Sequence, residues 1–209
     1  MERLLEGVRR FREQGLDAHR ERLQQLADHG QAPHTLFIAC SDSRVLPELI
    51  TDSDPGDLFV VRNIGNIVPP YHEPNAPFAT GAAIEYAVGV LGVANIVVCG
   101  HRRCGAIAAL IHGLRGHEGL RQLARWVEVA ARVRAKVLQV YGSLTEDQQL
   151  AAAEEENVLL SVANVGTYPV VEERVRAGTL RVHGWMLDIR TVELSAYDPA
   201  TGRFEPLLA

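Results

Sequence analysis

The sequence has no long hydrophobic run and no excess of positive charge, and its first residues do not show the pattern of a signal peptide. None of its 209 residues lies in a stretch that approaches the ~18 consecutive apolar residues of a membrane-spanning helix. The segment Met1–Glu6 lacks the apolar core and the small-residue cleavage site of a signal peptide. A formal net charge of −5 without blocks of like charge argues against a nucleic-acid surface. We therefore expect a cytoplasmic protein with neither a membrane nor a nucleic-acid partner.

Several catalytic signatures are also missing. The chain has no Gly-x-Gly-x-x-Gly sequence, no P-loop and no Cys-x-x-Cys pair. A cysteine phosphatase would need arginine six positions after its nucleophile, but position 46 is Leu46. The three cysteines (Cys40, Cys99 and Cys104) are an odd number, which in a reducing compartment indicates ligands or reactive thiols rather than disulfides.

What the sequence does contain is an alternation of predicted helices and strands. Four prolines between Pro69 and Pro77 predict a loop. The acidic run Glu154–Glu156 is expected on a solvated helix face. Apolar spacing predicts helices over residues 3–28, 79–91, 104–111, 120–141, 145–164 and 170–177, and strands over residues 35–39, 58–61, 95–99, 180–186 and 191–197.

This order of elements predicts an α/β fold. Strands separated by crossover helices form a parallel sheet with helices on its faces. We expect about four parallel strands plus an antiparallel edge strand, and a long N-terminal helix. The length, with 47% hydrophobic and 22% charged residues, suits a single domain over residues 1–209.

Two short segments at predicted strand ends carry metal-ligating side chains. Cys40 directly follows the strand at 35–39, and His101 and Cys104 follow the strand at 95–99. Ligand sites of parallel sheets lie beyond the carboxyl ends of the strands. Two thiols and one imidazole form a three-ligand zinc set, which leaves the fourth position for water as catalytic sites do. The sequence therefore predicts a zinc hydrolase or lyase, whereas Cys99, within the strand, is predicted to be a buried thiol.

Asp42 and Arg44 form a second constellation beside the first ligand. They are two apart in an extended segment, so their side chains share a face. Asp42 could bind zinc as a fourth ligand and close the site. Bidentate pairing with Arg44 would instead keep the carboxylate off the metal, where it would accept a hydrogen bond from water. The arginine favours this second interpretation.

The segments that carry these residues resemble the β-class carbonic anhydrases over nearly the whole chain. The matching stretches are residues 39–45, 56–63, 65–68, 83–88, 99–105 and 183–185. The resemblance implies one zinc ion per chain on Cys40, His101 and Cys104, with an Asp42–Arg44 dyad. It also implies reversible hydration of CO2 to bicarbonate and a proton by zinc-activated hydroxide. The expected assembly is a homodimer, often paired into tetramers, in which residues 1–30 form a helical dimerisation arm.

The β-class carbonic anhydrases that this chain resembles fall into two groups. The group that keeps water on zinc lines its CO2 pocket with residues that correspond to Gln31, Phe59 and Tyr86, the glutamine coming across the dimer interface. The other group has tryptophan where this chain has Phe37. The resemblance therefore places this chain in the open-site group. Taken singly, Phe59 and Tyr86 could be core aromatics and Gln31 a loop residue.

Three questions stay open at this point. A relative of the same fold could hydrolyse carbon disulfide or carbonyl sulfide with the same ligands. A non-catalytic zinc sensor would have a closed site with Asp42 on the metal. Arg102 and Arg103, where many members have small or polar residues, could attract bicarbonate or form ion pairs between subunits.

Overall fold

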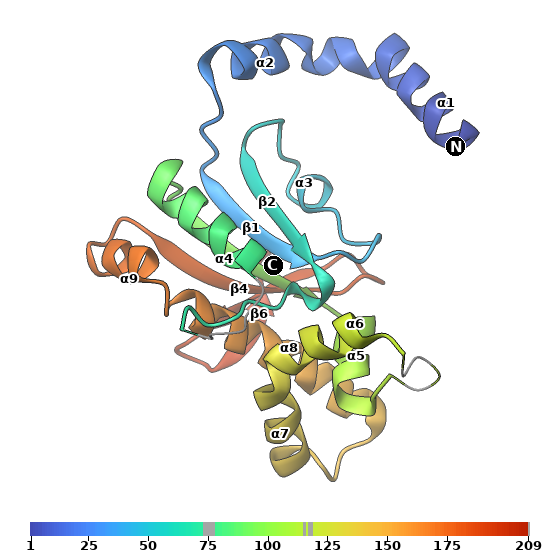
Figure 1. The fold of residues 1–209 in the computed structure, drawn as a ribbon, viewed down its shortest axis with the longest axis vertical. Helices are drawn as coiled ribbons and strands as arrows, with labels where there is room; N and C mark the ends of the chain where they lie inside the picture. Colours follow the sequence, from blue (N-terminus) through green and yellow to red (C-terminus); the bar gives the residue numbers. More distant parts are fainter. Residues whose placement is uncertain (73–77, 115, 117–118, 209) are drawn as a thin grey trace.

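The protein contains a six-stranded mixed sheet flanked by helices (Figure 1). The computed structural model describes residues 1–72, 78–114, 116 and 119–208. The strand order is β2-β1-β3-β4-β5-β6, with β1 to β4 parallel and β5 and β6 antiparallel. The strands are β1 (Thr35–Cys40), β2 (Leu58–Asn63), β3 (Asn95–His101), β4 (Arg181–Leu187), β5 (Leu194–Asp198) and β6 (Arg203–Pro206). The predicted α/β fold is confirmed, with a sixth strand that was not predicted.

The helices follow the predicted alternation, apart from the short helix α3, which was not predicted. They are α1 (Glu2–Arg10), α2 (Leu16–His29), α3 (Pro47–Ile50), α4 (Phe78–Glu85), α5 (Gly105–His112), α6 (Arg121–Val127), α7 (Ala131–Val140), α8 (Glu146–Val165) and α9 (Pro169–Arg176). The helix predicted over residues 120–141 is divided by a 3₁₀ turn at Glu128–Ala130. Within the described ranges, no helix is long and apolar enough to cross a membrane. The predicted proline-rich loop has no helix or strand at residues 69–72, and residues 73–77 lie outside the described part.

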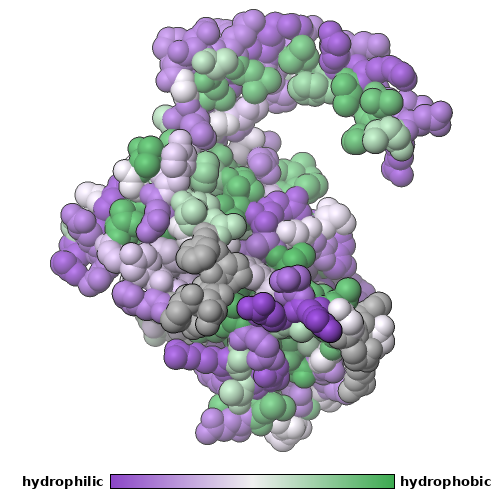
Figure 2. Space-filling model, viewed as in Figure 1, coloured by the Kyte–Doolittle hydropathy of each residue, from purple (hydrophilic) through white to green (hydrophobic). Residues whose placement is uncertain are grey.

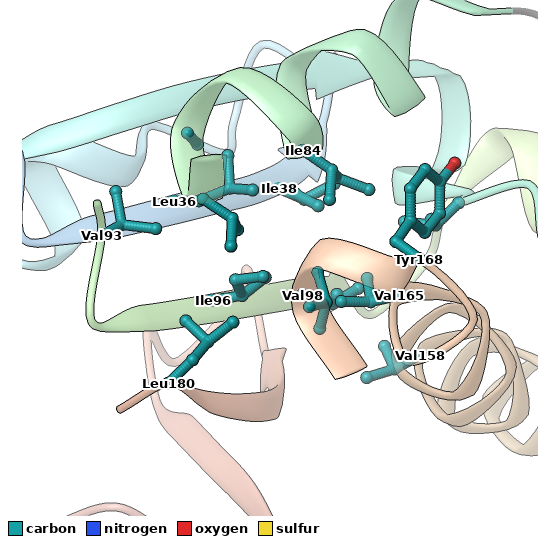
Figure 3. Packing of buried hydrophobic residues seen from close by; sticks show 14 of the residues in the cluster. Leu36, Ile38, Ile84, Val93, Ile96, Val98, Val158, Val165, Tyr168 and Leu180 are labelled. Atoms are coloured by element: carbon teal, nitrogen blue, oxygen red, sulfur yellow. The ribbon is translucent and has the colours of Figure 1, made fainter. Parts of the chain in front are cut away.

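The main core fills the space between one face of the sheet and α4, α8 and α9 (Figure 3). Leu36 and Ile38 of β1 alternate onto this face, and Ile96 and Val98 of β3 lie beside them. Helix α8 packs close to β3 because position 100 is glycine. A Cβ atom there would lie 2.5 Å from Val158 Cγ2 and 2.8 Å from Met186 Sδ.

The opposite face of β1 and β3 holds a smaller cluster that includes Phe37, Val97 and Cys99. Cys99 is fully buried, and burial raises the pKa of its thiol to about 12. This burial confirms the prediction of a buried thiol within the strand.

An N-terminal arm, residues 2–29, extends away from the body of the molecule (Figure 1). It consists of α1, a π-helical turn at Phe11–Gly15 and α2, and none of its residues is buried. Arg22 ties its end to the body through Asp57 and the Pro55 carbonyl. Apolar side chains gather along one side of the arm (Figure 2), among them the exposed Leu4, Val8 and Phe11.

Candidate metal centre

The carboxyl ends of β1 and β3 bring three ligating side chains together. Cys40 is the last residue of β1 and His101 the last of β3, and Cys104 precedes the first turn of α5. All three are buried, and their ligand atoms lie within 4.8 Å of one another. Strand pairing between Ala39 and Cys99 aligns the two ends. The group predicted from strand ends and spacing is thus assembled in the fold.

The His101 ring is oriented by its own backbone neighbour. Its Nδ1 lies 2.9 Å from the Arg102 carbonyl, an arrangement in which Nδ1–H donates and Nε2 carries the lone pair. Nε2 is buried without a hydrogen-bond partner among the described residues. A buried acceptor without a partner is costly, and a metal ion would satisfy it.

The two sulfur atoms are 4.0 Å apart. A hydrogen bond from Cys104 lowers the pKa of Cys40, and that same contact raises the pKa of Cys104. The two buried thiols therefore oppose each other's ionisation in the protein alone. A divalent cation would stabilise both as thiolates.

Backbone N–H groups near Cys40 and Cys104 also stabilise the thiolate form of these side chains. Gly65 N lies 3.4 Å from Cys40 Sγ, and Gly65 has φ +82°, a left-handed conformation that glycine adopts at little cost. Cys104 is the N-cap residue of α5, and its pKa is raised by the hydrogen bond with Cys40 and by burial, a rise that backbone hydrogen bonds at Ile107 and Ala106 partly oppose. The positive end of α5 also favours the thiolate form.

These distances fit tetrahedral zinc. Two sulfur atoms each about 2.3 Å from a tetrahedral zinc ion lie about 3.8 Å apart, close to the observed 4.0 Å. Thiolate and imidazole are ligands that zinc prefers. The group Cys40, His101 and Cys104 is therefore suited to one zinc ion with a fourth position left for water.

Asp42 lies beside this group and is held by Arg44. Arg44 Nε donates to Asp42 Oδ1 at 2.8 Å, and Arg44 Nη2 donates to Oδ2 at 2.7 Å. The backbone N–H of Arg44 also donates to Oδ1. These hydrogen bonds hold the pKa of Asp42 well below its usual range. Oδ2 lies 3.9 Å from His101 Nε2, so the carboxylate faces the metal position while both of its oxygens are bound by Arg44.

Two supporting residues were missed in the sequence. Arg62 of β2 donates to the carbonyls of Cys40 and Asp42, at 3.1 and 2.7 Å, and so fixes the loop that carries the dyad. Its signal was a charged side chain directly after the apolar residues Leu58–Val61 of the same strand. Glu154 of α8 accepts the Cys104 N–H at 2.8 Å.

The prediction of a solvated face for Glu154–Glu156 was wrong for Glu154. Its side chain is 3% exposed, and burial raises its pKa. It lies three and four residues before the buried Asn157 and Val158 of α8. This helical spacing was the signal that could have placed it on the inner face.

The residues expected to line the CO2 pocket lie elsewhere in the chain. The rings of Phe59 and Tyr86 are in contact, with centroids 5.8 Å apart. Phe59 pairs with Leu36, four residues before Cys40, so it lies about 13 Å along the strand from the metal ligands. Gln31 is exposed between the arm and β1. A single chain therefore brings Phe59 and Tyr86 together but does not join them to the metal centre.

The comparison with known proteins gives the family. The family model described as carbonic anhydrase matches residues 35–194. The chain is 44% identical over 198 residues to a carbonic anhydrase from a Synechocystis species, covering 95% of this chain and 71% of the relative. It is 42% identical over 207 residues to a carbonic anhydrase from Pseudomonas aeruginosa, covering 99% and 92%.

Solved structures agree with this match. The β-carbonic anhydrase CcaA superposes with a TM-score of 0.93 at 42% identity, covering all of this chain and 92% of the other. One of two tetrameric β-carbonic anhydrases from Sordaria macrospora superposes with a TM-score of 0.79 at 31% identity, covering 100% and 96%. Family, fold and ligand group agree, and the chain belongs to the β-carbonic anhydrase family.

Proposed function

We propose that this carbonic anhydrase hydrates CO2 reversibly to bicarbonate and a proton at one zinc ion held by Cys40, His101 and Cys104. When bound, zinc supplies a Lewis acid that lowers the pKa of a water molecule and so provides a nucleophile at neutral pH. The observation that carries the proposal is three buried ligand atoms within 4.8 Å, beside a carboxylate that Arg44 holds.

In this proposal, Asp42 orients the attacking water. Its Oδ2 accepts a hydrogen bond from that water, which directs the remaining oxygen lone pair at the carbon of CO2. Arg44 acts as a positioning residue, because its bidentate hydrogen bonds keep the carboxylate ionised and away from the metal. This arrangement supports the open-site interpretation over a closed sensor site.

We propose further that the complete site needs two chains. Phe59 lies about 13 Å along the strand from the metal ligands of its own chain, and the Tyr86 ring contacts Phe59, so both would line the pocket beside the partner's metal ion. Gln31 would reach the same pocket from the base of the arm. The exposed apolar side of the arm would pack on the partner, and the tetrameric relatives are consistent with such an assembly.

The remaining expectations also stay proposals. A cytoplasmic location fits two thiols that serve as ligands, since a reducing compartment keeps them available. Residues 1–209 would act as one domain with the arm as its dimerisation element. No finding favours the carbon disulfide, carbonyl sulfide or sensor alternatives.

The substrate is tested by measuring CO2 hydration and carbon disulfide turnover on the same zinc-loaded sample. We expect CO2 hydration to be the faster reaction by several orders of magnitude. Faster turnover of carbon disulfide would contradict the proposal and select the sulfur-substrate alternative. Turnover of neither substrate would select the sensor.

A further inference from the structure

A cavity of about 450 Å³ lies next to the metal centre and is lined mainly by arginine. Its walls come from loops that follow the carboxyl ends of β1, β3 and β4, where parallel sheets bind ligands. The lining residues are Arg44, Arg102, Arg103, Asp188, Ile189 and Arg190. Four guanidinium groups around one small cavity suggest an anionic ligand.

Arg102 and Arg103, whose roles could not be decided from the sequence, have different surroundings in the structure. Arg102 is fully engaged within the chain: it donates to the Ala151 carbonyl at 2.8 Å and pairs with Glu155. It therefore fastens the β3 loop to α8. Arg103 is exposed, and its side chain has no hydrogen-bond or ion-pair partner in the described part of the chain.

Arg190 is the second guanidinium without a partner among the residues that the structure describes. It is exposed on the loop after β4, and only its backbone N–H is bound, donating to Asp188 Oδ1 at 2.8 Å. Asp42 pairs with Arg44, and both Glu154 and Glu155 lie within ion-pair distance of Arg102. Among the residues that line the cavity, the unpaired guanidinium groups of Arg103 and Arg190 then face a single carboxylate, that of Asp188.

The backbone of Arg103 gives an independent reason to assign its side chain a role. Arg103 has φ +58°, in the left-handed region that glycine and asparagine adopt more easily than arginine. A long side chain at such a position is a local cost that a function would explain. Its carbonyl lies 3.4 Å from Arg44 Nη2, so the loop also contacts the arginine of the dyad.

We propose that this cavity is a binding site for a small oxyanion, distinct from the metal position. Arg103 and Arg190 would bind the anion through their planar N–H pairs, which match the oxygens of phosphate and bicarbonate. Arg44 would form the inner wall between the anion and Asp42. Both bicarbonate, which the proposed reaction releases, and a phosphate group have the required chemistry.

The test is calorimetric titration of inorganic phosphate into the zinc-loaded protein, its Arg103→Asn/Arg190→Gln variant and an Arg203→Gln control. Asparagine accepts the backbone conformation at position 103, and Arg190 is exposed, so the variant is expected to fold. Arg203 is an exposed arginine on β6, outside the cavity lining. We expect phosphate affinity to fall about tenfold or more in the double variant, as for lost charge-assisted hydrogen bonds, and to be unchanged in the control.

Repeating the titration with bicarbonate in the buffer distinguishes the two ligand sources. Weaker phosphate binding in the presence of bicarbonate would identify bicarbonate as a ligand of this site. Unchanged phosphate binding would indicate that the site binds phosphate groups and not bicarbonate. Equal phosphate affinity in wild type and double variant would place the anion at the metal and overturn the proposal, as would no phosphate binding to wild type. The titration does not depend on turnover. A wild-type protein that binds phosphate but does not hydrate CO2 would therefore count only against the proposed function.

Discussion

At the scale of single residues, Cys40 and Cys99 are both buried thiols with different surroundings. Cys40 faces a second thiol and an imidazole, whereas Cys99 lies among apolar side chains. We predict that Cys40→Ala loses zinc and CO2 hydration together. The same change at Cys99 should retain about one zinc per chain and cost only about 1–2 kcal/mol in the free energy of unfolding. Zinc analysis by mass spectrometry distinguishes them, and a zinc-loaded Cys40→Ala protein would contradict the assignment.

Replacing Arg44 should reveal that it positions the Asp42 carboxylate. Without its two side-chain hydrogen bonds, the Asp42 carboxylate is free to bind the metal as a fourth ligand. Arg44→Ala should therefore keep zinc while the hydration rate falls about a hundredfold, the usual order for a lost orienting group. Arg44→Lys should give an intermediate rate because lysine lacks the bidentate fork. A wild-type rate in Arg44→Ala would refute the positioning role.

Val192 is strained in a way that can be measured. It is 63% exposed and has φ +62°, which a β-branched residue adopts only at a cost. Val192→Gly should raise the free energy of unfolding by about 0.5–1 kcal/mol, because relieved strain exceeds the added chain entropy. Urea denaturation measures the change, with Val192→Ala as a control that keeps a Cβ atom. Destabilisation by glycine would show that the valine side chain contributes packing.

At the scale of helices and strands, the features that could be predicted were those that depend on the local pattern of apolar and polar residues. Strands β1 and β3 are continuous apolar runs, and ligands at their ends follow from parallel topology. Strand β6 was missed because, of Arg203–Pro206, only Phe204 is partly buried. The break at Glu128–Ala130 has no glycine or proline to mark it. Partners from distant helices, such as those that bind Arg102, could not be predicted from local pattern.

The arm is the element whose role is most open to test. Its apolar side is exposed in the single chain, and a partner would bury it. Leu4→Glu/Val8→Glu should turn a dimer or larger assembly into monomers while zinc is retained. Hydration should fall with it, because Phe59 and Tyr86 would no longer reach a partner's metal site.

Light scattering after size-exclusion chromatography measures the assembly. Arg10→Glu, a charge change at another exposed position of α1, serves as the control and should leave the assembly intact. A monomeric wild-type protein with full activity would contradict both the dimer and the shared pocket.

At the scale of the whole molecule, one sheet carries the two halves of the proposed site at opposite ends. The carboxyl ends of β1 and β3 hold the metal ligands, and the Phe59–Tyr86 pair lies four residues away along the β1–β2 register. The Arg-lined cavity adjoins the metal end. We therefore propose that each chain binds its own metal ion and that a pair of chains forms the complete pocket.

The most direct test of the central claim is stopped-flow CO2 hydration at pH 7 and pH 9, with zinc measured on the same sample. Arg44 holds the pKa of Asp42 well below its usual range, so the carboxylate is ionised and restrained at both pH values. We predict rapid hydration at both, with about one zinc ion per chain. Hydration confined to pH 9 would contradict the account by indicating that Asp42 closes the site at neutral pH, and full zinc without hydration at either pH would refute the enzyme assignment.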